Sequence, residues 1–109
     1  MKNVSDVLVV SESDALRTLM KFALGRWWGV VIRNADSHDA ARAALNERAP
    51  QFAIVDMALP DVDDLGREIA SKTQVIAVNA EGSVAWASET AQAPFQPQKL
   101  HVAIEGLTG

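Results

Sequence analysis

Short apolar runs alternate with segments of helical spacing along most of the chain. Four of these runs are predicted strands, and the first is a short, continuous apolar run of the kind that is covered on both faces of a parallel sheet. They span residues 6–10, 30–34, 52–56 and 74–79. Residues 93–95, which include Pro94 and are soon followed by Pro97, form a fifth and weaker candidate strand.

Between these runs the apolar residues recur at intervals of three and four, which predicts helices. Ser13 or Asp14 can cap the first helix, and Asp36 or Ser37 can cap the second. Shorter helical segments are predicted over 65–72, 83–91 and 98–107. The chain is therefore expected to fold as one α/β domain over residues 1–109, with a parallel sheet between two layers of helices.

Polar residues follow three of the predicted strands directly. Ser11 and Glu12 follow the first strand, Asp56 ends the third, and Asn79 ends the fourth. In a parallel sheet these ends meet at one edge, where ligands and reactive groups gather. Because Asp, Asn and Ser are also ordinary turn residues, the pattern alone leaves a structural and a functional interpretation open.

Composition and charge exclude several classes of function. The chain has no cysteine, so neither a disulfide framework nor a thiolate site can form. Ten basic against fourteen acidic residues give a net charge of −4 without a basic cluster, so we expect no direct nucleic-acid binding. No run is long enough for a signal peptide or a membrane span, and a cytoplasmic protein without membrane contact is expected.

Several motifs in sequence order resemble the receiver domains of two-component response regulators. The motifs are VLVVSESDALR, IVDMALPDVDDL, VIAVNAE and PFQPQKL. The resemblance implies a flavodoxin-like, doubly wound (βα)5 fold with strand order 2-1-3-4-5. The third, fourth and fifth helices are expected to be shortened, because only 40 residues separate Asp56 from Gln96.

The resemblance also implies a phosphoacceptor site. Asp56 stands at the position of the carboxylate that takes a phosphoryl group from a sensor histidine kinase. Glu12, Asp56 and the backbone carbonyl of Ala58 stand where Mg²⁺ would be held, and Asn79 and Gln96 stand where the phosphoryl group would be contacted. Such a transfer depends on an ionised nucleophile and on positioning and neutralising the phosphoryl charge.

This site lacks several groups that the family normally has. Ser11 replaces a carboxylate, Asn79 replaces a Ser or Thr, and Gln96 replaces a Lys. A neutral hydrogen bond has about half the strength of a charge-assisted one, so Gln96 is a poor substitute. We therefore predict an atypical pseudo-receiver that acts by protein–protein interaction, with weak or no phosphorylation and with weak or absent Mg²⁺ binding.

Two alternatives stay open. The first is a working phosphoacceptor that a histidine kinase phosphorylates at Asp56. The second is a small flavodoxin-like protein that binds a nucleotide or flavin, although no glycine-rich phosphate loop follows the first strand. We expect a sensor histidine kinase or another signalling protein as partner, a homodimer, no enzymatic activity, and a place as the N-terminal regulatory part of a longer protein.

Overall fold

Strands and helices alternate along the chain up to the fourth strand. The computed structural model describes residues 4–93 and 96–108. In chain order the elements are β1 (Asp6–Val10), α1 (Asp14–Leu24), β2 (Val31–Ala35), α2 (His38–Glu47), β3 (Phe52–Asp56), α3 (Val62–Ala70), β4 (Gln74–Ala80), β5 (Glu89–Gln92) and α4 (Pro97–Thr108).

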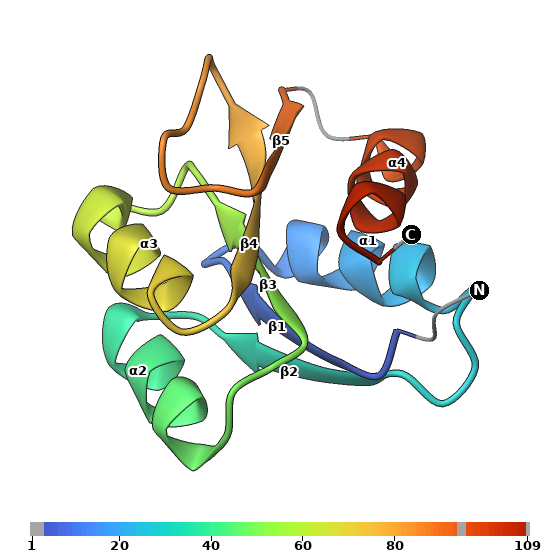
Figure 1. Ribbon diagram of the computed structural model, residues 1–109, viewed down its shortest axis with the longest axis horizontal. Helices are drawn as coiled ribbons and strands as arrows, with labels where there is room; N and C mark the ends of the chain where they lie inside the picture. The colour runs from blue at the N-terminus through green and yellow to red at the C-terminus, as the bar shows by residue number, and fades with distance from the viewer. Residues whose placement is uncertain (1–3, 94–95, 109) are drawn as a thin grey trace.

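The five strands form one parallel sheet in the order β2-β1-β3-β4-β5, so the predicted strand order is confirmed. Helices α1 and α4 lie on one face of the sheet, and α2 and α3 lie on the other (Figure 1). Strands β2 and β5 are the two edges. Because all strands are parallel, the carboxyl ends of β1, β3 and β4 lie side by side at one end of the sheet, as the alternation of elements predicted.

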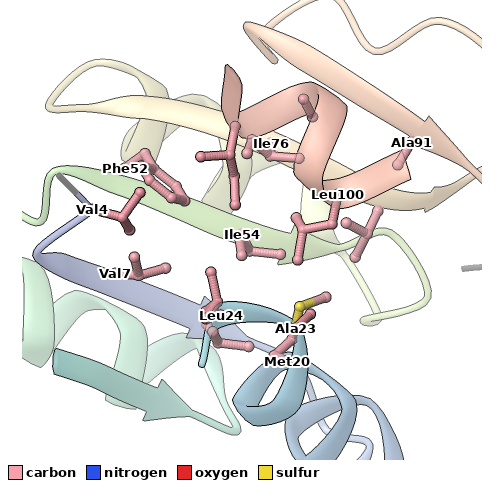
Figure 2. Close-up of a cluster of buried hydrophobic side chains, with 14 of the residues drawn as sticks. Val4, Val7, Met20, Ala23, Leu24, Phe52, Ile54, Ile76, Ala91 and Leu100 are labelled. Atoms are coloured by element: carbon pink, nitrogen blue, oxygen red, sulfur yellow. The ribbon is translucent and has the colours of Figure 1, made fainter. Parts of the chain in front are cut away.

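Two apolar clusters hold the layers together. The cluster under α1 and α4 includes Met20, Leu24, Ile54 and Leu100, which point toward one another from helix and sheet (Figure 2). The cluster under α2 and α3 is built in the same way from the other side of the same strands. Strand β3 is buried at every residue, which explains why its sequence is a continuous apolar run rather than an alternating one.

The first two helices begin at predicted caps. The Ser13 hydroxyl oxygen accepts a hydrogen bond from the Leu16 amide at 3.1 Å, and that of Ser37 accepts one from the Ala40 amide at 3.1 Å. Each side chain satisfies one of the amides that a helix leaves unpaired in its first turn. Of the alternatives that the sequence offered, Ser13 and Ser37 are therefore the caps.

The predicted fourth helix over 83–91 is wrong. Residues 81–88 form a loop, and the fifth strand follows at Glu89–Gln92 instead of at 93–95. Ala93 lies in a bend after that strand, and residues 94 and 95 lie outside the described residues. The loop lies on α3, where the indole Nε1 of Trp86 donates to a carboxylate oxygen of Asp63 at 2.9 Å. This packing replaces the helix that would otherwise cover that part of the sheet.

The expectation of a shortened last helix is also wrong. Helix α4 has 12 residues and begins at Pro97, which suits the first position of a helix because its missing amide needs no partner there. The third helix is short, with 9 residues, but begins at Val62 rather than at residue 65.

Among the described residues, no helix combines the length and the apolar character that crossing a bilayer requires.

Candidate functional site

Asp56 is a buried carboxylate that joins the ends of three strands. It is the last residue of β3, and only 4% of its surface is exposed. Its Oδ2 accepts a hydrogen bond from the Ser11 hydroxyl at 2.7 Å. Its Oδ1 accepts one from the Ala58 backbone amide at 2.9 Å and a longer one from the Asn79 side-chain amide at 3.4 Å. Both oxygens of the carboxylate are thus engaged by neutral donors of the protein.

Ser11 is fully buried at the end of β1 and has a complete set of partners. Its hydroxyl donates to Asp56 and accepts from the Ser13 amide at 3.0 Å. Its own amide donates to the carbonyl of Ala35 at 3.0 Å, and its carbonyl accepts from the guanidinium of Arg17 at 2.7 Å. The hydroxyl is therefore held in one orientation, toward Asp56.

Asn79 reaches Asp56 from a distorted part of β4. Its backbone is left-handed, with φ of 57°, and the register between β4 and β5 shifts between Ala77 and Ala80. One extra residue on β4 forms a bulge, a feature that changes the direction of a side chain at a strand end. Asn tolerates the left-handed region better than β-branched Thr, so the backbone gives a physical reason for Asn at this position.

Glu12 lies apart from the hydrogen bonds around Asp56. It is exposed and lines an open pocket of about 320 Å³. The other lining residues come from the loop after β2, the first residue of α2 and the loop after β3, namely Asp36, Ser37, His38, Leu59, Pro60 and Asp61. Within the described part of the chain, no hydrogen bond joins Glu12 to Asp56. The predicted pair of carboxylates is therefore adjacent along the edge of the sheet but not directly linked.

Gln96 is exposed immediately before α4. Its carbonyl accepts hydrogen bonds from the amides of Lys99 at 3.0 Å and Leu100 at 3.3 Å, so it serves as the start of that helix. The ammonium group of Lys99 donates to the Gln92 carbonyl on β5 at 3.4 Å. Among the described residues, the donors to Asp56 are thus Ser11, Ala58 and Asn79. Gln96, like Glu12, is a predicted site residue that no hydrogen bond connects to Asp56 in this part of the chain.

These residues fit Mg²⁺ poorly. The ion prefers six oxygen ligands in near-octahedral geometry. Here both oxygens of Asp56 already accept hydrogen bonds, a hydroxyl donor stands at position 11, and Glu12 faces a neighbouring pocket. No group of three or more acidic or histidine side chains among the described residues is arranged to hold a metal ion. No chemical step through a metal follows from this arrangement.

Two side chains near the site were not singled out by the sequence. Arg17 contacts the Ser11 carbonyl and forms an ion pair with Asp14. His38 at the start of α2 donates through Nε2 to the Pro60 carbonyl at 2.8 Å, which fixes the loop that follows Asp56. Only their positions in the sequence could have indicated these contacts. Arg17 lies one helical turn after the cap Ser13, and His38 directly follows the cap Ser37.

Comparisons with solved structures agree with this architecture. The chain is similar to the signal receiver domain of a Luxo repressor protein from Vibrio parahaemolyticus, with 24% identity over 94% of this chain and 90% of that chain and a TM-score of 0.78. It is similar to a CheY-like response regulator receiver domain from Methylobacillus flagellatus, with 19% identity over 96% and 99% and a TM-score of 0.79.

A third similar structure is NtrX from Brucella abortus. It shares 28% identity over 95% of this chain but only 27% of its own length, with a TM-score of 0.78. No protein-family model matches the sequence, and no curated protein matches it significantly. The resemblance that the sequence motifs suggested is confirmed at the level of the fold: the chain has the flavodoxin-like fold of response regulator receiver domains.

Proposed function

We propose that this chain is a pseudo-receiver, a receiver-fold signalling module that works through protein–protein contact with weak or no phosphorylation of Asp56. The observation that carries the proposal is the 2.7 Å hydrogen bond from the buried Ser11 hydroxyl to Asp56. A phosphoacceptor carboxylate needs an oxygen open to the incoming phosphorus. At this site, each oxygen already accepts at least one hydrogen bond from a group of the fold, so an incoming phosphorus would have to compete with these donors.

Electrostatics support the same conclusion. Phosphoryl transfer is catalysed mainly by neutralising charge on the transferred group. The three donors to Asp56 are a hydroxyl, a backbone amide and a side-chain amide, all of which are neutral. The guanidinium of Arg17 contacts the Ser11 carbonyl and Asp14 rather than Asp56. Transfer to Asp56 would thus receive little stabilisation, and Mg²⁺ binding is expected to be weak or absent.

The proposed role is non-enzymatic and cytoplasmic. The partners that we propose are a sensor histidine kinase or another signalling protein, and a second copy of the chain. The net charge of −4 and the absence of a basic cluster from the sequence support a protein partner rather than nucleic acid.

Mass spectrometry after incubation with a small phosphodonor and Mg²⁺ tests the proposal. The unmodified chain should gain no phosphate or only a trace. The double variant Ser11→Asp, Gln96→Lys, which returns the two missing charges, should gain one phosphate that the additional change Asp56→Asn removes. Stoichiometric phosphorylation of the unmodified chain, lost in Asp56→Asn, would refute the proposal in favour of a working phosphoacceptor.

A further inference from the structure

Strand β2 is an open edge of the sheet. The amide of Val31 donates to the Ser5 carbonyl at 2.7 Å, and the Ala35 carbonyl accepts from the Ser11 amide at 3.0 Å. Residues 31, 33 and 35 therefore bond to β1, and the alternation of a strand turns the backbone groups of Ile32 and Asn34 outward. The strand contains neither Pro nor Lys and pairs with β1 without a bulge, and its one charged side chain, Arg33, is turned back onto Asp6, so little at this edge opposes pairing with another strand.

There is room for another strand beside this edge. An open groove of about 570 Å³ separates β2 from α1; it is lined by Val30, Ile32, Asn34, Asp14, Arg17, Thr18 and Lys21. On the other face of the sheet, Arg42 of α2 bonds to Glu68 of α3. Helical periodicity places Ala40 and Ala44 on the opposite side of α2 from Arg42. Both alanines are half-buried and small, so they add little bulk on this side of α2.

We propose that a second copy of this chain adds its own β2 antiparallel to this edge, which joins the two sheets across a two-fold axis. In the register centred on Arg33, Ile32 of one copy faces Asn34 of the other. Each such pair exchanges two backbone hydrogen bonds, because both residues direct their backbone groups outward. The exposed side chain of Val31 then lies opposite the partner's Ala35. This contact uses the same surface on both copies, as a two-fold dimer requires.

The charges of α1 match this arrangement. Helix α1 runs antiparallel to the strands, so Asp14 lies near the carboxyl end of β2 and Lys21 near its amino end. The two-fold axis places Asp14 of each copy opposite the partner's Lys21. Arg33 faces its own symmetry mate, but its guanidinium turns back onto Asp6 at 3.1 Å, a carboxylate that it shares with Arg48. The ends of the two α1 helices are therefore complementary in charge, in addition to the backbone pairing.

The same charges make a second copy a better occupant than an acidic peptide. Two cations, Arg17 and Lys21, line the groove, but Asp14 lies at the opposite end from Lys21 and is paired with Arg17. A ligand of one charge sign would meet repulsion from one end of the groove. An antiparallel copy of α1 presents opposite charges at each end and avoids this repulsion.

This dimer rests on the proposed function, which includes a second copy of the chain as a partner, and it names the surface that would be used. Its test needs neither phosphodonor nor Mg²⁺, so the two proposals can fail separately. Sedimentation velocity over a concentration series should show a monomer–dimer equilibrium. Hydrogen exchange followed by NMR should show the Ile32 and Asn34 amides becoming protected as concentration rises. The Val31 and Arg33 amides, which bond to β1, should be protected at all concentrations and serve as an internal control.

Matched variants locate the interface. Asn34→Pro removes an outward amide without touching the bonds to β1, and should weaken dimerisation at least about tenfold, whereas Asn34→Ala keeps the amide and should not. Asp14→Lys or Lys21→Asp alone should weaken the dimer, and the double reversal should restore it. The double reversal tests the contact even if Asn34→Pro fails to fold.

A monomer at every concentration would overturn the proposal. So would a dimer that survives Asn34→Pro and both single charge reversals, since another surface would then carry the contact. Protection of Ile32 and Asn34 only when a different protein is added would assign the edge to that partner instead, and would equally overturn pairing between two copies.

Discussion

At the scale of single residues, Asp56 stabilises the end of the sheet through three hydrogen bonds. Its partners lie after β1, after β3 and at the end of β4, so one carboxylate joins three neighbouring strands. Hydrogen bonds to a charged group typically contribute about 1.5–3 kcal/mol, more than those between neutral groups. The carboxylate therefore has a structural role that requires no phosphorylation.

Asp56→Asn should lower the free energy of unfolding by about 1–2 kcal/mol, because an amide replaces a carboxylate that accepts from three donors. Chemical denaturation at neutral pH measures this change. Asp64→Asn, which alters an exposed carboxylate on α3, is the control and should have little effect. A more stable Asp56→Asn variant would instead indicate a repulsive cluster of carboxylates.

Asn79 should be sensitive to branching at the β-carbon. Its φ of 57° is tolerated by Asn and Gly but is strained for a β-branched residue. Asn79→Thr should therefore cost about 1–2 kcal/mol of unfolding free energy, while Asn79→Gly should cost less despite losing the side chain. Thermal or chemical unfolding of the two variants provides the comparison; equal stability of the Thr and Asn forms would contradict the left-handed backbone.

At the scale of elements, periodicity predicted the buried strands well and the polar ones poorly. The runs at 6–10 and 52–56 match β1 and β3 at both ends. Strand β5 was missed because its sequence, ETAQ, has one buried residue and no β-branched or aromatic run. It forms because its backbone pairs with that of β4. Such pairing depends on the tertiary structure and cannot be inferred from the local pattern of apolar residues.

The 81–88 loop was mistaken for a helix for a related reason. Its tryptophan, Trp86, packs on α3 instead and forms part of the apolar cluster under α2 and α3. A β-carbon added to Gly66 would lie 2.3 Å from ring atoms of Trp86, so the indole rests directly on the backbone of α3. Gly66 thus has a packing role that is evident only once the loop is placed.

Gly66→Ala should displace Trp86 from α3 and loosen the loop. In a background with Trp27→Phe and Trp28→Phe, the remaining tryptophan should shift its emission to the red as it becomes more exposed. In a Trp86→Ala background the same glycine change should be neutral or stabilising by about 0.5–1 kcal/mol, because Ala favours helices over Gly. Unchanged emission in the Gly66→Ala variant would argue against this contact.

The candidate site was predicted in part. The order of strands brought residues 11, 56 and 79 together, as the rule for strand ends led us to expect. The hydrogen bond between Ser11 and Asp56 depends on a rotamer and on burial, neither of which can be inferred from sequence spacing. The positions of Glu12 and Gln96 depend on loop conformation, and neither side chain is hydrogen-bonded to Asp56 in the described residues.

At the scale of the whole molecule, Asp6 links the first strand to the segment after α2. Its carboxylate accepts from Arg48 at 2.7 Å and from Arg33 at 3.1 Å, and its side chain is 19% exposed. Burial by itself would raise the pKa of the Asp6 carboxyl, but the hydrogen bonds and charges of Arg48 and Arg33 outweigh it and hold the pKa below its ordinary value. The same contact raises the pKa of Arg48.

Because the folded-state pKa of Asp6 is lowered, its contribution to stability is complete above the unfolded pKa of about 3.9 and is lost as pH falls through the folded value. Asp6→Asn should therefore lower the free energy of unfolding by about 1 kcal/mol at neutral pH, and the difference from the unmodified chain should shrink in strong acid. Denaturation curves across this pH range measure the difference. A gap that stays constant into strong acid would contradict the assigned pairing.

We propose that the neutral donors that engage both oxygens of Asp56 leave binding of a divalent cation at this carboxylate weak or absent. An NMR titration with Mg²⁺ tests it most directly, because the Ala58 amide donates to Asp56 and reports any change there. We predict that the Ala58 and Asn79 amide signals stay in place at millimolar Mg²⁺ in the unmodified chain and move in Ser11→Asp. A saturable shift of those signals in the unmodified chain at millimolar Mg²⁺ would contradict the account.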